Sequence, residues 1–426
     1  PTTTLVTGFD IIFFWVARMT MMAGAFTGKM PFSDVYIHGL VRDEQNRKMS
    51  KSLGNGIDPL RLIEKYGTDA LRFALIREVA GAGQDIRLDY NRKDNTSLTV
   101  EASRNFANKL WNATRFALMN LEGDTQKSLG KLDYENLQIS DKWILSRLAR
   151  LNRECVNYYR DYGLGEVAKS LYEFAWNDFC DWYLELIKPR LNLNSDESID
   201  ALSSKHSARQ VLVKVLTDLF TMLHPLMPHI TEELWHAINN NEEEQLLALQ
   251  SWPALDLSHL DDQLESSFKY LFDSIRIVRN LRAIAGLKPS QNAPVRFVTN
   301  KAEVALMLNQ SILDIKTLTR ASEVQIFDKK NAESKTGEKV LASVLGDLQI
   351  ILPIEGLVDI DSLCNRLEKD IAKADKDVLA LSARLANHNF LKKAPPNVVS
   401  ECRDNLLEAT TQRDLACKRL TDLKDV

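Results

Sequence analysis

Cysteine is scarce in this sequence, and its spacing argues against two common kinds of site. Five cysteines are scattered over 426 residues, and no two of them form a Cys-x-x-Cys pair. An odd, dispersed set is typical of reduced thiols rather than of a disulfide framework. Because no histidine stands at ligand spacing from any cysteine, we predict no metal site built by the protein.

A strong charge of one sign and a long apolar run are also absent. The formal net charge is −4, from 54 basic and 58 acidic residues, so whole-chain charge indicates no polyanionic partner. No run of about eighteen residues is apolar without interruption, and we therefore expect no membrane span. Dispersed free thiols and the lack of a signal-peptide pattern favour a cytoplasmic protein.

What is present is enough chain for several domains, about three or four at this length. Hydrophobic residues make up 45% of the chain, which supports sizeable cores. Changes in periodicity divide the sequence into four parts. We predict an α/β part at 1–95, a helical bundle at 96–290, a small α/β module at 291–356 and two long heptad helices at 357–426.

The most informative pattern is a short basic loop. Residues 48–52, Lys-Met-Ser-Lys-Ser, place two lysines and two hydroxyls together. A turn and a helix start follow, with Asp58 as N-cap and Pro59 as the first helical residue. A cationic loop beside a helix N-terminus is typical of a phosphate site. The alternative is a solvated basic loop.

Two short apolar strands precede this loop. Thr4–Gly8 and Val35–Val41 read as strands, and Phe9–Met19 is long and apolar enough for a buried helix between them. This order predicts half of an open α/β nucleotide-binding sheet, Rossmann-like in type, whose ligands lie beyond the carboxyl ends of the strands. Gly8 and Asp10 would then face the ligand.

These patterns resemble one family. Residues 48–52 match the second signature motif of class I aminoacyl-tRNA synthetases, and residues 8–15 look like the helix that shapes their amino-acid pocket. Within the class the chain is similar to bacterial valyl-tRNA synthetases, at residues 35–59, 105–116 and 224–235 and over the last seventy residues.

The resemblance implies a valine–tRNA ligase. ATP, expected with Mg²⁺ bound, and valine would give valyl-adenylate and pyrophosphate, and the valyl group would then move to tRNA-Val. Lys51, with Lys48 beside it, would stabilise the charge on the leaving pyrophosphate. The implied ATP-binding residues are Gly8, Asp10, His38, Gly39, Val41, Lys48, Met49, Ser50, Lys51 and Ser52.

Some of these residues have plainer alternatives. His38 would equally suit a satisfied histidine at a strand end. Ile11 and Trp15 are four apart and would share one helix face; the resemblance makes them walls of the valine pocket, and core packing is the other interpretation. Phe13, Phe14 and Met19 are assigned to the core.

The family's first signature, a His-x-Gly-His tetrapeptide, does not occur here, and the inserted editing domain has no counterpart. The chain therefore resembles the carboxy-terminal portion of a larger enzyme and would hold half of an active site. We expect it not to aminoacylate by itself.

The helical part resembles the anticodon-binding bundle of the class. Its best basic element is the helix Ser274–Lys288, where Arg276, Arg279 and Arg282 recur every three residues opposite an apolar face. We predict an outward arginine row, which either contacts the tRNA backbone or is merely solvated.

The last segment predicts an antiparallel coiled-coil hairpin. Apolar positions step by three and four from Cys364 to Leu385 and again from Val399 to Leu423. The resemblance makes this a tRNA-binding arm, with Lys392 and Lys393 at its tip as contacts. A dimerisation seam is the alternative to the monomer that we expect.

Two other identities remain open. An isoleucyl-tRNA synthetase would share the lysine motif, but its relatives typically carry Gln-His where this chain has Ile11 and Ile12. A tRNA-binding module without catalysis would have kept the loop by descent.

Overall fold

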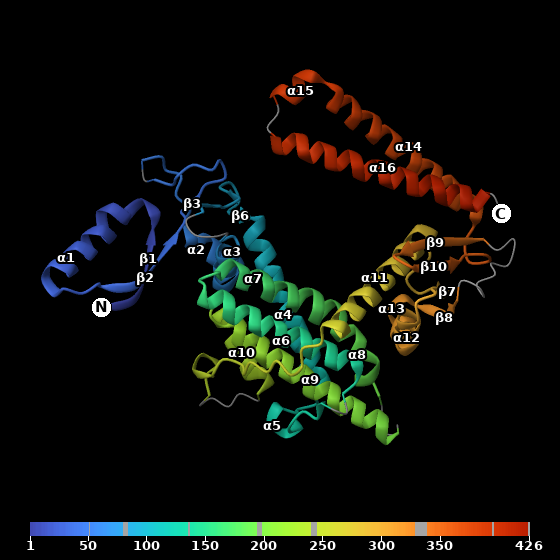
Figure 1. The fold of residues 1–426 in the computed structure, drawn as a ribbon, viewed down its shortest axis with the longest axis horizontal. Helices are drawn as coiled ribbons and strands as arrows, with labels where there is room; N and C mark the ends of the chain where they lie inside the picture. Colours follow the sequence, from blue (N-terminus) through green and yellow to red (C-terminus); the bar gives the residue numbers. More distant parts are fainter. Residues whose placement is uncertain are drawn as a thin grey trace. The chain divides into compact units, whose positions relative to one another are not determined.

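The computed structural model describes residues 1–426 except 51, 80–83, 135–136, 194–197, 240–244, 329–338, 394–395 and 425–426. The described chain is largely helical with small sheets and forms two compact units, 1–262 and 263–426 (Figure 1). The finer division into four domains stays a prediction.

The first unit begins with the expected strand–helix–strand order. Strands β1 (Thr2–Gly8) and β2 (Phe32–His38) pair in parallel, with Gly8 opposite His38. The chain between them forms a 3-10 turn, Phe9–Ile11, a π-helical turn, Ile12–Val16, and helix α1 (Ala17–Thr27). The carboxyl ends of the two strands therefore lie together.

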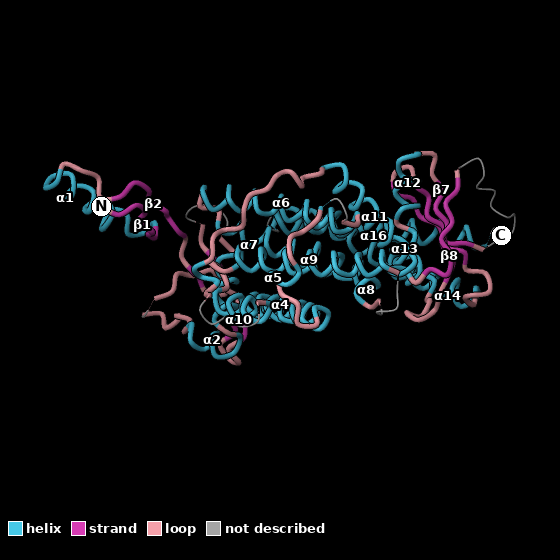
Figure 2. The backbone as a smooth tube through the Cα atoms, turned by 90° about the horizontal axis from the view of Figure 1, so that it is seen from below, coloured by secondary structure: helices cyan, strands magenta, loops and turns pink. Residues whose placement is uncertain are grey.

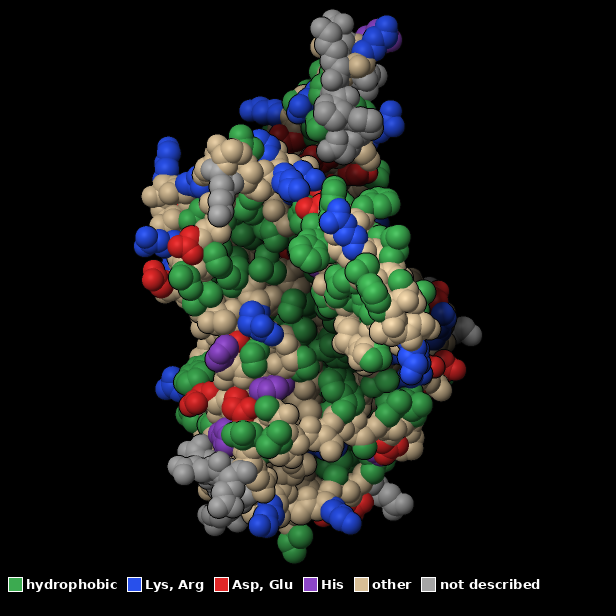
Figure 3. All heavy atoms as spheres, turned by 90° about the vertical axis from the view of Figure 1, so that its left-hand side faces the viewer, with side chains coloured by type: hydrophobic (Ala, Val, Ile, Leu, Met, Phe, Trp, Pro, Cys, Tyr) green, Lys and Arg blue, Asp and Glu red, His purple; other side chains and the backbone are tan. Residues whose placement is uncertain are grey.

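The connecting segment is not buried, so its assignment to the core is wrong. Phe13 is 82% exposed and Phe14 62%, while Met19 is also exposed. In the described chain β1 and β2 form a two-stranded sheet, and Figure 3 shows hydrophobic side chains gathered on the face of the molecule that carries this part. A hydrophobic pattern alone does not say which segment covers it.

The same segment bears on the expectation of no membrane span. Phe9–Thr27 is a 19-residue helical stretch with a mean hydropathy of 1.4, which is long and apolar enough to cross a membrane by length and composition alone. Asp10 and Arg18 interrupt the apolar run. The core helix of a soluble protein meets the same two criteria.

Two more helices follow the basic loop. Strand β3 (Val41–Arg42) pairs in parallel with β4 (Ile86–Arg87), and the loop leads into α2 (Pro59–Tyr66) and α3 (Thr68–Arg77). The predicted cap is confirmed, because the Asp58 carboxylate accepts a hydrogen bond from the Leu60 N–H at 3.0 Å.

The N-cap of α3 is Gly67, at φ +91°. The buried Asp69 carboxylate, in the first turn of α3, accepts hydrogen bonds from the backbone N–H groups of His229 and Ile230, at 3.4 and 2.6 Å. Asp69 thus caps α10 (Pro228–Ile238), a helix about 160 residues away in sequence.

The helical bundle forms as predicted, with one buried polar network in its core. Arg190 donates to both carboxylate oxygens of Asp141 at 2.9 and 2.8 Å, and the Tyr183 hydroxyl donates to Asp141 at 2.8 Å. Phe179, Trp182 and Tyr183 are buried in the core of the bundle. A short hairpin, β5 (Tyr90–Asn91) and β6 (Thr96–Ser97), leads into the bundle, whose helices are cyan in Figure 2. Besides α10, the helical segments of the bundle are α4 (Leu98–Leu121), α5 (Gln126–Leu129), α6 (Ile139–Arg160), α7 (Leu164–Glu173), the π-helical Phe174–Tyr183, α8 (Leu184–Leu191) and α9 (Ile199–Leu223).

The second unit combines a sheet with long helices. The sheet order is β8-β7-β10-β9, where β7–β8 is parallel and the other pairs are antiparallel. Helix α14 packs against α16, and Arg413 on α16 lies 3.9 Å from Asp375 on α14. The elements are α11 (Asp262–Ala285), β7 (Ala293–Val298), α12 (Ala302–Gln310), α13 (Ile312–Thr319), β8 (Ala321–Phe327), β9 (Val340–Leu345), β10 (Leu348–Pro353), α14 (Ile360–Ala386), α15 (His388–Lys393) and α16 (Pro396–Lys424).

Candidate functional site

The carboxyl ends of β1 and β2 bring several of the predicted nucleotide-binding residues together. The Lys48 ammonium donates to the Asp10 carboxylate, with 3.1 Å between Nζ and Oδ2. A Cβ atom added to Gly8 would lie 2.8 Å from Asp10 Oδ1 and 3.6 Å from the His38 ring. Residues 40 positions apart in sequence thus share one small site at the strand ends.

Local contacts fix the positions of His38 and Gly39. His38 Nδ1 lies 2.7 Å from the Gly39 carbonyl oxygen, which suits a satisfied histidine at a strand end. A Cβ atom on Gly39 would lie only 1.9 Å from the Gln84 carbonyl oxygen. Only glycine lets these two backbone segments approach so closely.

Asp85 is part of this site, although the sequence analysis missed it. Its carboxylate accepts a hydrogen bond from the Leu40 N–H at 2.7 Å and a second from the Arg42 guanidinium. These bonds, together with the nearby positive charges of Arg42 and Lys48, hold the pKa of Asp85 below its usual range. Asp85 therefore stays ionised and ties the start of β3 to the neighbouring segment.

The loop is held by Asn55, a second residue that the sequence analysis did not assign. Its amide nitrogen donates to the Asp43 carboxylate at 3.0 Å and to the Lys48 carbonyl at 3.2 Å. Its amide oxygen accepts from the Ser50 N–H at 2.9 Å. The buried Asn55 side chain therefore joins both ends of the described part of the loop to Asp43.

Asp43 is the buried partner of this amide. Burial on its own would raise the pKa of Asp43, but hydrogen bonds from Asn55 and from the Arg47 backbone and side chain hold it well below the usual range. The charged carboxylate is thereby kept as an acceptor.

The serines of the loop bond to each other. Ser50 Oγ and Ser52 Oγ are 3.1 Å apart, and Ser50 Oγ accepts from the Leu53 N–H at 3.2 Å. Met49 and Val41 are half-buried. Lys51, the residue predicted to be catalytic, lies outside the described residues.

Ile11 and Trp15 do not form a pocket in the described structure. They are 39% and 61% exposed, and they lie on 3-10 and π-helical turns rather than on one α-helix. The spacing argument assumed α-helical geometry, so a shared face does not follow from it. Their role as pocket walls stays a prediction.

The prediction of an outward arginine row on α11 is wrong at one of its three positions, Arg282. Arg276 and Arg279 are exposed; Arg276 pairs with Asp273 at 2.7 Å, and Arg279 donates to the Leu318 carbonyl oxygen at 3.0 Å. Arg282 is 7% exposed and donates to the Gln291 carbonyl oxygen. Two of the three arginines therefore join α11 to its neighbours.

At the arm, Lys392 is exposed on α15, and the Lys393 side chain lies outside what the structure describes. The predicted free thiols are confirmed, because all five cysteines are unpaired. Burial raises the pKa of Cys155 and of Cys180 to about 12, so both thiols are unreactive at neutral pH. Among the described residues, no group of three or more His, Cys, Asp or Glu side chains could hold a metal ion.

Models of three protein families match the chain. The model described as tRNA synthetases class I (I, L, M and V) matches residues 1–89, which contain the Lys48–Asp10 site. The anticodon-binding domain of tRNA ligase matches 141–297, and the valyl tRNA synthetase tRNA binding arm matches 359–424. The chain belongs to the class I aminoacyl-tRNA synthetases.

Within that class, the curated relatives that match this chain are valine–tRNA ligases. The valine–tRNA ligase of Parasynechococcus marenigrum (strain WH8102) is 67% identical over 99% of this chain and 46% of its own length. That of Prochlorococcus marinus (strain MIT 9313) is 66% identical over 99% of this chain and 45% of its own. The chain thus spans about half the length of the curated relatives that it matches.

The chain also has a distant similarity to solved structures. A ternary LeuRS–tRNA–LeuAMS complex from Agrobacterium radiobacter K84 matches 76% of this chain and 37% of its own, at 15% identity. The TM-score of this match is 0.46.

Proposed function

We propose that this chain is the part of a valine–tRNA ligase that carries the lysine loop and the tRNA-binding elements. The observation that carries the proposal is 67% identity to a valine–tRNA ligase over 99% of the chain. The matched relatives are named for valine rather than isoleucine, which favours the first interpretation over its near rival.

The reaction proposed has two steps. An oxygen of the valine carboxylate attacks the α-phosphorus of ATP and forms a carboxyl–phosphate anhydride bond. The bond from the α-phosphorus to the bridging oxygen breaks, and pyrophosphate leaves. A hydroxyl of the terminal adenosine of tRNA then attacks the valyl carbonyl, and AMP leaves. Mg²⁺ on the ATP would neutralise phosphate charge in the first step.

In this reaction, the role of the residues in this chain would be to bind and orient the phosphate groups. Asp10 holds the Lys48 ammonium at the carboxyl end of β1, the edge where open α/β sheets bind nucleotides. Lys48 and Lys51 would stabilise the charge that grows on the leaving pyrophosphate. Asn55 holds the backbone of the loop between Lys48 and Ser50. The conformation of this part of the loop is therefore fixed before a nucleotide binds.

The finer fold is part of the proposal. The β1–α1–β2 unit would be half of a Rossmann-like sheet, and its exposed apolar face would pack against the rest of a synthetase domain. Supporting this, residues 1–89 match a synthetase model, and the curated relatives are about twice as long as this chain. A synthetase core explains an apolar Phe9–Thr27 segment without a membrane.

The partner proposed is tRNA-Val, and we propose a cytoplasmic monomer. The matches to an anticodon-binding domain and to a tRNA binding arm support RNA contacts in both units. Helices α14 and α16 would form the coiled-coil arm, with Lys392 and Lys393 at its tip, and Arg276 and Arg279 are exposed arginines of α11.

The test is valine-dependent ATP–pyrophosphate exchange by the complete protein that contains these residues. Replacing Lys51 or Lys48 by alanine should lower the exchange rate by about 10²–10³, as the loss of one preorganised charge at a transition state does. Lys169→Ala, an exposed lysine on α7, is the matched control. Unchanged exchange in both loop variants, or exchange driven by isoleucine instead, would refute the proposal.

A second experiment distinguishes the ligase from the remaining alternative, a tRNA-binding module without catalysis. The 426-residue chain alone should bind tRNA-Val but not valylate it. If the 426-residue chain binds tRNA-Val and the complete protein shows no valine-dependent exchange, the tRNA-binding module is favoured.

A further inference from the structure

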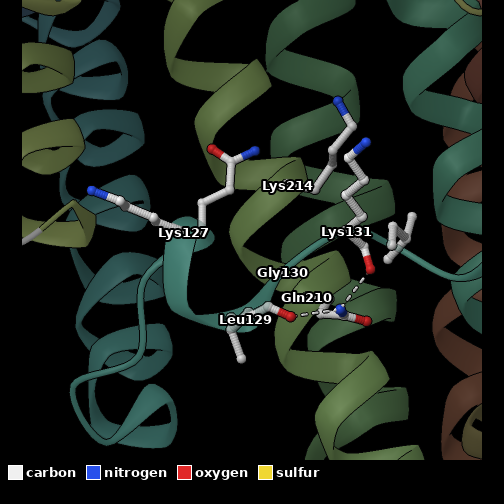
Figure 4. Close-up of a pocket in the computed structure, with 8 residues that line it drawn as sticks. Lys127, Leu129, Gly130, Lys131, Gln210 and Lys214 are labelled. Atoms are coloured by element: carbon white, nitrogen blue, oxygen red, sulfur yellow. Dashed lines mark hydrogen bonds between the residues drawn. The ribbon is translucent and has the colours of Figure 1, made fainter.

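A cavity on the helical bundle, away from the loop site, is lined by three lysines. It has a volume of about 450 Å³ and lies between α9 and the segment that runs from α5 toward α6 (Figure 4). We call it the lysine cavity. Its lining residues are Gln126, Lys127, Leu129, Gly130, Lys131, Leu132, Gln210 and Lys214.

The floor of the lysine cavity is fixed by one amide. Gln210 Nε2 donates to the carbonyl oxygens of Leu129 and Lys131, at 2.8 and 3.0 Å. These bonds hold the segment 129–131 against α9, so the backbone that carries Lys131 is set before any ligand arrives. In Figure 4 the side chains of Lys131 and Lys214 extend in the same direction.

The charge of the cavity is positive and only partly compensated. None of its lining residues is acidic. The Lys214 ammonium pairs with the Asp218 carboxylate at 2.6 Å, whereas Lys127 and Lys131 make no ion pair within the described part of the chain. The whole chain carries a net charge of −4, so this positive cluster stands against the overall balance.

We propose that the lysine cavity binds a phosphodiester group of an RNA backbone. Lysine is a compact point charge that suits a phosphate without demanding bidentate geometry. The lining has no aromatic side chain on which a nucleobase could stack. A backbone phosphate is an anion that needs no such stacking partner.

The RNA would be the tRNA of the proposed function, on which this inference therefore rests. The anticodon-binding match at 141–297 includes Gln210 and Lys214 but not the segment that carries Lys127 and Lys131. The cavity thus adds a contact from outside the matched range. Phosphate contacts of this kind fix register on the RNA without reading its sequence.

The test measures tRNA-Val binding by the 426-residue chain and by the complete protein as a function of salt. Lys131→Gln removes one charge where no ion pair is broken, so the slope of log K against log salt should become shallower by about 0.7–0.9. At about 0.1 M salt this is a loss of roughly five- to tenfold in affinity. Lys131→Arg should restore the slope, and Lys169→Gln should leave it unchanged.

Three outcomes would overturn the inference. An unchanged slope in Lys131→Gln and Lys127→Gln, with tRNA binding intact, would sink the cavity but not the proposed function. No tRNA binding by the unmodified protein would sink both. Inorganic phosphate that binds by calorimetry, and is lost in Lys131→Gln while tRNA binding stays the same, would assign the cavity to a small phosphorylated ligand.

Discussion

Asn55 uses both amide donors and its amide oxygen within the loop site. The bonds go to Asp43, to the Lys48 carbonyl and from the Ser50 N–H. Arg92 in turn donates to the Asn55 and Gly56 carbonyl oxygens. Few side chains could serve all of these positions, because the set needs two donors and one acceptor on one planar group.

We predict that Asn55→Asp impairs pyrophosphate exchange by the complete protein. The new carboxylate would face Asp43 across the 3.0 Å contact and could not donate to Lys48, so the loop would lose its set conformation. The expected change is a tenfold or greater fall in kcat with little change in KM for valine. A displacement of a catalytic group by about 1 Å lowers the rate by about 10²-fold.

The matched control for this loop variant is Asn309→Asp, an exposed amide on α12. The exchanged pair Asp43→Asn with Asn55→Asp restores one amide–carboxylate contact and should recover part of the rate. A normal rate in Asn55→Asp alone would show that the loop does not depend on this amide.

Asp43 also predicts a pH dependence. Its folded pKa is depressed, so its stabilising contribution is present above the unfolded value of about 3.9 and is lost as pH falls through the lower folded value. Thermal unfolding of the protein and of Asp43→Asn should therefore differ between pH 5 and 7 and converge as the solution is made more acidic than pH 4. A constant difference down to pH 2 would contradict this.

At the scale of elements, capping and bridging groups come from distant segments. Asp69 on α3 caps α10, and Asp89 accepts hydrogen bonds from the N–H groups of Leu98 and Thr99 at the start of α4. Arg282 joins α11 to the turn before β7. The Arg282 contact explains why this arginine is buried, although Arg276 and Arg279 at the same helical spacing are exposed.

Arg282 and Arg276 should therefore behave differently when truncated. Arg282→Ala removes a buried donor from the Gln291 carbonyl and should lower the free energy of unfolding by about 1–3 kcal/mol. Arg276→Ala, in an exposed pair with Asp273, should change it by less than about 1 kcal/mol. Denaturant unfolding of both variants tests this, and equal effects would mean that the Arg282 contact contributes nothing.

At the scale of the whole molecule, the apolar surface of residues 6–30 is the largest anomaly. Phe13 and Phe26 are 82% and 79% exposed, and contiguous apolar patches usually mark a contact surface. If the rest of a synthetase domain covers this face, the 426-residue chain should bind a hydrophobic dye and the complete protein should bind far less.

The double variant Phe13→Ser with Phe26→Ser should remove most of that dye signal from the 426-residue chain. Leu98→Ser, at a position 76% exposed on α4, is the matched control and should not. Equal dye binding by the chain and the complete protein would leave the apolar face uncovered and argue against a packed domain.

The sequence by itself determined the local chemistry: the lysine loop, the Asp58 cap, the parallel strand order and the long helices of the last segment. These follow from turn residues, periodicity and spacing, which act over a few residues. Only the tertiary structure decided that Asn55 and Asp85 belong to the loop site, that Arg282 is buried, that Asp69 caps a helix about 160 residues away, and that Lys131 and Lys214 line one cavity. Burial and long-range hydrogen bonds depend on which segments meet, and a local pattern does not contain that information.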